Sequence, residues 1–348
     1  MKRFFTRKYI SIICLVVFVF CALYLPHVLQ YFRSGPDTRY QFAAGFIPDY
    51  YQYLSWIKSG SLGDFLLTTR YSGIAHPKVL VHPLFSITGQ ITGRLHITPP
   101  YAFLLLQIIA TAVFLYMLYL FIRTLYPSGF SRNLAICFFL FGTGLYTIAK
   151  EAGVWQVVDP ISWSGHFNII SKYSIPPHHL LALAAWMGLV ILFTRSLLAL
   201  RQAQGKLKGE TFRNLLPSII LGWCIALLNP SIFLFGLIFL ISGFVLSVLY
   251  PSKLQALSSK LLLKRLLIFL LCVSPVLLYN IFILRLVPPW SIMYQRTLAF
   301  NPDTSFINYL FSLGPLLPLS LIGIWIIRKR LTLIHFIMAS WAYLPILL

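Results

Sequence analysis

Acidic side chains are scarce in this chain, which has 7 Asp and Glu residues among 348 residues. Charged residues of both signs make up only 10%, whereas hydrophobic residues make up 59%. The mean hydropathy of +0.82 is higher than that of soluble globular proteins. The composition therefore excludes an ordinary soluble enzyme and predicts a membrane protein with several transmembrane helices.

Several motifs that carry chemistry are missing. The sequence has no glycine-rich phosphate loop, nucleophile elbow or HExxH motif, and its 5 cysteines lie in apolar segments that imply neither disulfides nor a zinc site. Asp159 has no acid two residues away, which excludes the Asp-x-Asp pattern that often holds a divalent metal. His178 and His179 are neighbours whose side chains diverge on a helix, and no other histidine has metal-ligand spacing. We therefore predict no metal and no cofactor.

Basic residues are abundant by contrast, and the formal net charge is +21. They lie mostly in short loops between apolar runs, where they set orientation by the positive-inside rule rather than bind nucleic acid. With the N-terminus in the cytoplasm, 18 of the 28 basic residues lie inside. Most of the acids then lie outside, namely Asp37, Asp49, Asp64, Glu151, Asp159 and Asp303. We therefore expect carboxylate chemistry on the extracytoplasmic face of the plasma membrane.

Transmembrane helices need roughly 20 apolar residues each. That length predicts spans at 9–31, 99–122, 133–149, 178–199, 215–229, 231–250, 266–284 and 306–327, and a ninth from Leu331. Because the chain stops at Leu348 inside this ninth span, we expect a truncated C-terminus. The predicted fold is an all-α polytopic bundle that forms one membrane domain over residues 1–348, with outer loops at 33–98, 150–177 and 285–305.

The first outer loop contains an amphipathic stretch, FIPDYYQYLSWIKSG, at positions 46–60. Its apolar residues have helical spacing, which predicts a helix that lies on the membrane surface; they are Tyr50, Tyr53, Leu54 and Ile57. Asp49 starts this helix and has two open interpretations. It is either an N-cap, which Gln52 at capping-box spacing favours, or a general base at the membrane surface.

Two further segments shape the outer face. The apolar run Val79–Leu95 contains Gly89, Gly93 and Arg94, which make it a poor span, so we predict a second interfacial or re-entrant helix. Segment 215–229 is too short to cross the ~30 Å hydrocarbon core and ends at Asn229 before a proline. Its end either lines a watered cavity or forms a tight hairpin.

The later outer loops contain the remaining candidate residues. Glu151, Asp159 and Lys172 lie among tryptophan and tyrosine residues, which indicate either an aromatic belt at the membrane interface or a platform for sugar stacking. Arg285 and Arg296 lie in the third outer loop, and an arginine suits a phosphate through its bidentate fork. We single out Arg296, close to Tyr294, as the phosphate ligand.

In layout, the chain resembles the GT-C superfamily of integral-membrane glycosyltransferases, which includes protein mannosyltransferases and aminoarabinose transferases. The resemblance rests on the large first outer loop, its amphipathic helices and the position of Asp49 after the first span. Many members have paired acids in this loop, whereas this chain has Asp49 alone and Asp64 further on. The resemblance implies transfer of a sugar from a polyprenyl-phosphate donor on the extracytoplasmic face. Asp49 would then be the catalytic base, and Arg296, with His178 or Lys172, would hold the donor phosphate.

Other functional classes stay open. A transporter or lipid flippase is the main alternative, followed by a polysaccharide polymerase or ligase and by a non-catalytic relative of the superfamily. Under the glycosyltransferase interpretation, the partners are the lipid-linked donor, membrane lipids and an unidentified acceptor. The predicted substrate-binding residues are Arg296, Asp64, Glu151, Asp159, Lys172 and His178.

Overall fold

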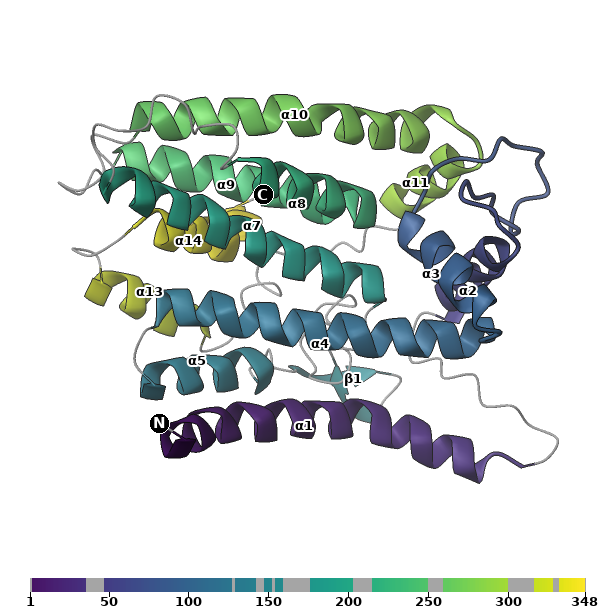
Figure 1. Cartoon of the computed structure of the whole chain (residues 1–348), viewed down its shortest axis with the longest axis horizontal. Helices are drawn as coiled ribbons and strands as arrows, with labels where there is room; N and C mark the ends of the chain where they lie inside the picture. The colour runs from purple at the N-terminus through teal and green to yellow at the C-terminus, as the bar shows by residue number, and fades with distance from the viewer. Residues whose placement is uncertain are drawn as a thin grey trace.

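The structure is a computed structural model, which describes residues 2–35, 47–126, 129–141, 147–151, 154–158, 176–202, 215–249, 259–299, 316–327 and 332–347. Its helices are α1 (Lys2–Arg33), α2 (Ile47–Ser61), α3 (Pro83–Arg94), α4 (Pro99–Leu125), α5 (Gly129–Phe141), α7 (Pro177–Gln202), α8 (Leu216–Leu228), α9 (Pro230–Leu249), α10 (Ser259–Leu286), α11 (Trp290–Ala299), α13 (Leu316–Ile327) and α14 (Leu333–Leu347). The strands β1 (Thr147–Glu151) and β2 (Val154–Val158) form an antiparallel hairpin. The long helices run side by side, and α2, α3 and α11 lie at one end of them (Figure 1).

Within the described residues, five helices are long and apolar enough to cross a membrane: Val16–Arg33, Pro99–Leu125, Pro177–Thr194, Pro230–Leu249 and Leu263–Leu286. They match the predicted spans at 9–31, 99–122, 178–199, 231–250 and 266–284. Helix α8 is apolar but shorter. The prediction of a helical, multi-pass membrane protein is therefore confirmed.

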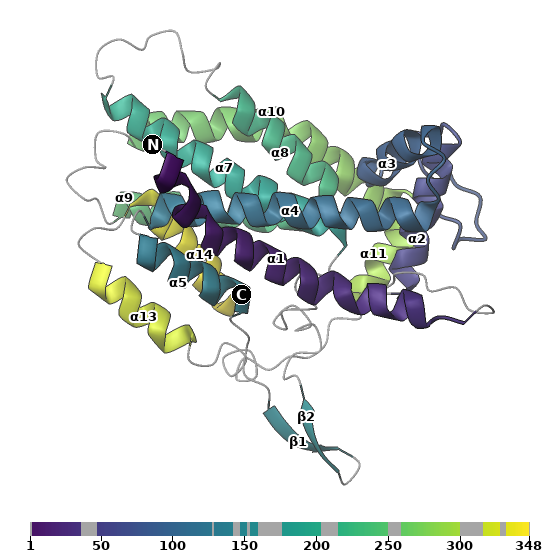
Figure 2. The same ribbon diagram turned by 60° about the horizontal axis from the view of Figure 1, so that its bottom comes forward.

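The predicted span 133–149 is wrong in its last part. Helix α5 ends at Phe141, and positions 147–149 belong to strand β1. Glycines at positions 142 and 144 lower the helix propensity of this stretch, and β-branched Thr147 and Ile148 favour a strand. The hairpin stands clear of the helical bundle in Figure 2.

Several helices begin at a proline, which lacks the N–H that a first helical turn leaves without a partner. Examples are Pro83 in α3, Pro99 in α4, Pro177 in α7 and Pro230 in α9. Each of these prolines also restricts the backbone conformation of the residue before it. The sequence therefore indicates where these helices start more clearly than where they end.

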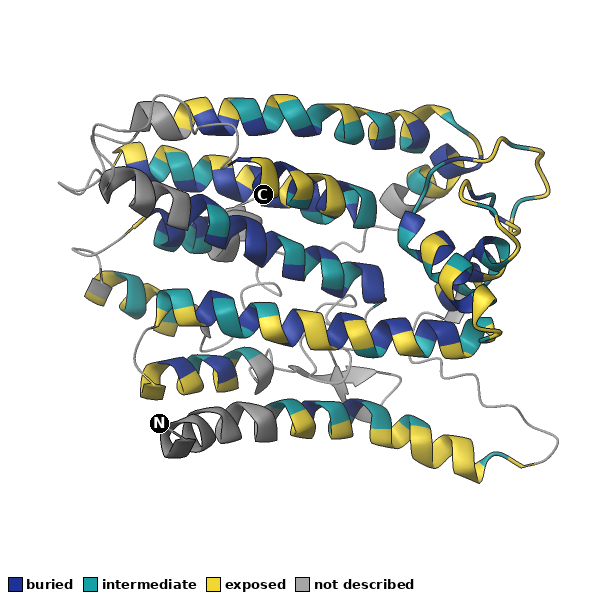
Figure 3. Ribbon diagram, in the orientation of Figure 1, coloured by how far each residue is buried: buried dark blue, intermediate teal, exposed yellow. Residues whose placement is uncertain are grey.

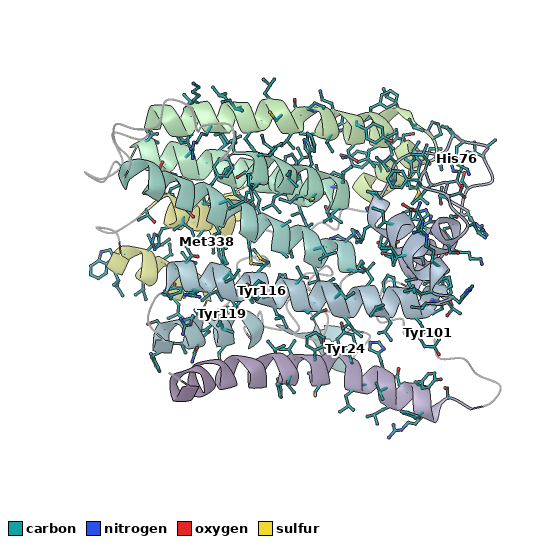
Figure 4. All side chains as sticks on the ribbon, viewed as in Figure 1. Tyr24, His76, Tyr101, Tyr116, Tyr119 and Met338 are labelled. Carbon is teal, nitrogen blue, oxygen red and sulfur yellow. The ribbon has the colours of Figure 1, made fainter. Side chains whose placement is uncertain are left out.

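The main core lies between α4, α7, α8, α9 and α10, whose inward faces are buried (Figure 3). Trp186 of α7 fits against the bare backbone of Gly236 in α9. Helix α1 is tied to this bundle by a hydrogen bond of 3.1 Å between the hydroxyls of Tyr24 and Thr111, and Figure 4 shows Tyr24 pointing from α1 towards α4.

A second, smaller hydrophobic core lies at one end of the helical bundle. We call its elements the cap: α2, the connection at positions 62–82, α3 and α11. Its buried apolar residues come from the cap and from the adjoining ends of α4 and α10; they are Tyr50, Tyr53, Trp56, Ile57, Leu67, Val79, Phe85, Ala102, Phe103, Leu106, Ile283 and Trp290. The apolar face of α2, predicted to lie on the membrane surface, therefore packs against protein.

Helices α2 and α3 approach each other through glycines. A Cβ atom added at Gly89 would overlap the carbonyl oxygen of Ile57, and one added at Gly60 would overlap that of Ser86. Gly89 and Gly93 form a small-xxx-small pattern of the kind that brings membrane helices close together. Gly89 and Gly93, which make this segment a poor transmembrane span, thus allow α3 to pack closely against α2.

Candidate functional site

The break between α8 and α9 lies where the cap meets the bundle. Helix α8 ends at Asn229, which has extended backbone angles, and α9 starts at the next residue. The Asn229 side chain accepts a hydrogen bond from the Ile232 amide at 3.0 Å, and its Nδ2 lies 2.8 Å from Nδ1 of His179 in α7. The irregular backbone predicted at this depth is therefore held by one asparagine side chain and one histidine.

His82 reaches this break from the connection between α2 and α3. Its backbone is left-handed, with φ 45° and ψ 57°, immediately before Pro83. A non-glycine residue in this region costs about 1–3 kcal/mol, and such strain clusters at functional sites. Burial lowers the pKa of His82 from 6.5 to about 4, and a hydrogen bond to the backbone of Leu228, at the end of α8, opposes this shift. His82 is therefore neutral at pH 7.

The histidine rings at this junction touch one another. The ring centroids of His82 and His178 are 4.8 Å apart, and those of His178 and His179 are 4.3 Å apart. The expectation that His178 and His179 diverge is wrong for this position. Both residues lie in the first turn of α7. The third ring, that of His82, comes from a distant part of the chain. Spacing rules for a single helix do not describe contacts with a ring from another segment.

Aromatic side chains surround these histidines. The ring of His178 meets Tyr53 at 5.3 Å and Phe85 at 5.5 Å, measured between ring centroids. The indole of Trp56 stacks on His82 at 5.3 Å and meets Trp290 of α11 at 5.9 Å. We call His82, His178, Tyr53, Trp56, Phe85, Trp290 and the nearby Gln52 the aromatic–histidine cluster.

A hydrogen-bond network fixes the connection between α2 and α3. Gln52 accepts a bond of 2.9 Å from the Thr69 hydroxyl, and the Thr69 amide donates to Nε2 of His76 at 3.1 Å. The indole of Trp56 donates to the Thr68 carbonyl at 3.0 Å. Gln52 is therefore buried in this network, and the capping box predicted from its spacing to Asp49 is wrong.

Asp49 occupies the third position of α2, inside its first turn. Its carboxylate makes no hydrogen bond or ion pair with any residue that the structure describes, so it is not acting as an N-cap there. The residue is exposed, yet incomplete solvation of its carboxyl group raises its pKa above the ordinary value. Burial, together with the charge of Asp49, raises the pKa of Tyr53. Asp49 thus has no partner among the described residues, and it lies one helical turn from the aromatic–histidine cluster.

The other predicted residues are dispersed. Asp64 forms a surface ion pair with Lys78 at 2.5 Å. Glu151 ends strand β1, and Arg296 lies in α11, but their side chains are outside the described set, as are Asp159 and Lys172 altogether. The guanidinium of Arg285 lies over the ring of Tyr294, at 5.0 Å from its centroid. Of the predicted substrate-binding residues whose side chains the structure describes, His178 lies in the cluster and Asp64 does not.

The sequence-based interpretation missed His82, Gln52 and Trp290 as parts of one site. The proline after His82 was a signal of an unusual backbone, but nothing local indicates that the ring turns towards α7 and α8. Among the described residues, no group of three or more His, Cys, Asp or Glu side chains is arranged to hold a metal ion.

Comparison of the chain with protein-family models, with curated proteins and with solved structures finds no match.

Proposed function

We propose that the protein is an integral-membrane glycosyltransferase that moves a sugar from a polyprenyl-phosphate donor to a lipid, glycan or protein acceptor. The observation that carries the proposal is the Asp49 carboxylate: exposed, with a raised pKa, and without an ion-pair or hydrogen-bond partner among the described residues. Asp49 belongs to α2, which lies with α3 and α11 at one end of the helical bundle (Figure 1). A carboxylate in this state is suited to accept a proton.

In the proposed reaction, Asp49 removes a proton from an acceptor hydroxyl or amine as that atom attacks the anomeric carbon of the donor sugar. A bond forms between the acceptor and the anomeric carbon, and the bond from that carbon to the phosphate oxygen breaks. The lipid phosphate leaves with the electron pair. Arg296 stabilises its charge through charge-assisted hydrogen bonds, which suits a guanidinium. Helix α11, which contains Arg296, packs within the cap against α2 through the contact of Trp290 with Trp56.

The proposal includes a topology. The chain crosses the plasma membrane about nine times, counting the shorter helices α5, α8, α13 and α14 with the five long ones. The N-terminus is cytoplasmic, and the cap lies at the extracytoplasmic surface with α2 and α3 along the membrane. Lipid-linked donors presented on that face would then meet Asp49.

The test is donor turnover by the purified full chain in lipid nanodiscs, with polyprenyl-phosphate-linked hexoses and pentoses as donors. Release of polyprenyl phosphate that depends on an added acceptor supports the proposal. The same donors are also tested in membranes that supply native acceptors. If no donor is turned over there, the proposal is contradicted.

A transporter is the second candidate, and one observation favours it. The broken helix pair α8–α9 meets the half-buried His179 at Asn229, and broken helices with ionisable groups beside them mark substrate paths in transporters. Uptake of a labelled solute into proteoliposomes, without donor turnover, would favour this second function over the first.

A further inference from the structure

Four polar atoms in the aromatic–histidine cluster are buried and have no hydrogen-bond partner among the residues that the structure describes: Nε2 of Gln52, Nδ1 of His82, Nδ1 of His178 and Nε1 of Trp290. Gln52, His178 and Trp290 are only 5%, 3% and 4% exposed. More than about 90% of buried polar groups in proteins have a partner, so a group of such atoms in one place needs an explanation. A ligand that supplies the missing partners would provide one.

The four atoms belong to side chains that are linked by contacts through Trp56 and His82. The indole of Trp56 is 5.3 Å from the His82 ring and 5.9 Å from the Trp290 ring, measured between centroids. Gln52 precedes Trp56 by one helical turn on α2, which places both on the same face. The ring of His178 is 4.8 Å from that of His82. The polar atoms therefore come from four neighbouring elements of the chain: α2, the connection at 62–82, α7 and α11.

The donor and acceptor character of these atoms is mixed. An amide nitrogen and an indole nitrogen can only donate, so Gln52 Nε2 and Trp290 Nε1 need acceptors. The neutral His82 ring bonds the backbone of Leu228 and has no partner at Nδ1, so its proton is on Nε2 and Nδ1 needs a donor. A hydroxyl group satisfies both needs, because it donates and accepts.

Charged ligands do not fit this arrangement. A phosphate offers mostly acceptors and would meet the acceptor Nδ1 of His82, whereas an ammonium offers only donors and would meet the indole and amide donors. The seven side chains of the cluster include no carboxylate, ammonium or guanidinium, and an unpaired charge costs several kcal/mol when it is buried. The ligand should therefore be uncharged.

We propose that the aromatic–histidine cluster binds an uncharged hydroxylated ring, such as a hexopyranose. Its hydroxyl groups would pair with Gln52, His82, His178 and Trp290. The C–H face of such a ring is weakly positive and suits the negative face of an indole such as Trp56. Because the polar atoms are screened from solvent, the ring enters when the cap moves relative to α7.

The proposed function makes this ring the sugar of the donor, so that role rests on the proposed function. Binding of the ring by the aromatic–histidine cluster does not depend on the proposed function. Asp49 lies one turn before Tyr53 on α2, and a sugar held in the cluster would stand beside the free carboxylate. Failure of sugar transfer and failure of sugar binding are therefore separate results.

The experiment is saturation-transfer NMR on the full chain in nanodiscs, with free D-mannose, D-glucose and D-galactose as probes. At least one hexose should receive saturation on its ring protons, and glucose 1-phosphate and glucosamine should receive much less. Trp290→Phe and His178→Phe should each weaken hexose binding about fivefold to tenfold, which is the loss of one hydrogen bond. Neither variant should lower the unfolding temperature, because each removes a buried polar atom that had no partner in the unliganded protein.

Trp223→Phe is the matched control, because its indole already donates to the Cys272 carbonyl at 2.9 Å and it lies outside the cluster. It should leave hexose binding unchanged. The proposal is overturned if no hexose binds, if Trp223→Phe weakens binding as much as Trp290→Phe, or if the charged sugars bind as well as the neutral ones. Hexose binding without donor turnover leaves this inference standing and removes the proposed function, and turnover without hexose binding does the reverse.

Discussion

The imidazole rings of His82 and His178 lie edge to face, with their centroids 4.8 Å apart. His82 ends the long connection of the cap, and His178 starts helix α7 of the bundle. This contact joins the connection between α2 and α3 to the helical bundle beside the break at Asn229. The position of the cap, and with it of Asp49, depends on a junction of neutral, buried imidazoles.

His82 should make stability depend on pH. Its pKa falls from 6.5 in the unfolded chain to about 4 in the folded one. Between these values the unfolded chain binds a proton that the folded protein excludes, so the free energy of unfolding decreases as the pH drops from 6.5 towards 4. The total loss from this group is about 3 kcal/mol. His82→Asn keeps a residue that tolerates left-handed backbone and should remove this part of the pH dependence, as measured by denaturant unfolding across the same interval.

His96→Asn is the control for that measurement. His96 also has positive φ, 55°, but it is exposed and outside the cluster. Its replacement should leave the pH dependence of wild type unchanged. An equal effect of both substitutions would show that the loss on acidification does not come from the buried ring.

Gly89→Ala should destabilise the cap. The added methyl group meets the carbonyl oxygen of Ile57, which is backbone and cannot rotate away. Overpacking of this kind costs about 2 kcal/mol, and thermal unfolding in nanodiscs measures it. Gly73→Ala is the matched control, because a Cβ atom there meets nothing within 4 Å and the change should stay within about 0.5 kcal/mol. Equal unfolding temperatures for the two variants would contradict the tight α2–α3 contact.

The proposed orientation can be tested by cysteine labelling of intact cells in a cysteine-free background. Gly73 is exposed in the first outer loop, so Gly73→Cys should react with an impermeant reagent. Gly60 is unsuitable because it packs against the backbone of Ser86. Lys206→Cys and Gln255→Cys, in sequence segments that the basic residues assign to the cytoplasm, should not react. Reaction at position 206 would reverse the topology and remove the extracytoplasmic site.

Arg296→Ala should raise the KM for the lipid-linked donor, because it removes the proposed phosphate ligand. Arg285→Ala is the comparison: the guanidinium of Arg285 lies over the Tyr294 ring at 5.0 Å, a contact that ties α10 to α11. It should lower stability by about 0.5–1 kcal/mol and change KM less. A larger increase in the donor KM for Arg285→Ala than for Arg296→Ala would contradict these roles and assign the phosphate to Arg285.

The sequence predicted the elements that depend on local periodicity. The helix predicted over 46–60 is α2, Ile47–Ser61, and its predicted apolar face, with Tyr50, Tyr53 and Ile57, is buried. The long apolar runs likewise appear as α1, α4, α7, α9 and α10. Periodicity and length are properties of one segment, so they predict a helix without information about the segments that it packs against.

The sequence did not predict what those faces contact. The apolar side of α2 suits a membrane surface or a protein core equally well, and α3 and α4 cover it here. The junction of His82, His178 and Asn229 joins segments that are distant in the chain, so no spacing pattern marks it. The failed capping box has the same cause, because Thr69 binds Gln52 from outside the helix.

The central claim is that Asp49 is the general base of a sugar transfer. The direct measurement is the rate of polyprenyl-phosphate release by Asp49→Asn in nanodiscs, compared with Asp64→Asn, whose parent carboxylate is paired with Lys78. Asparagine keeps the shape but cannot accept the proton, so Asp49→Asn should lose about 100- to 10,000-fold in rate at an unchanged unfolding temperature, while Asp64→Asn stays near wild type. Near wild-type turnover by Asp49→Asn would contradict the account.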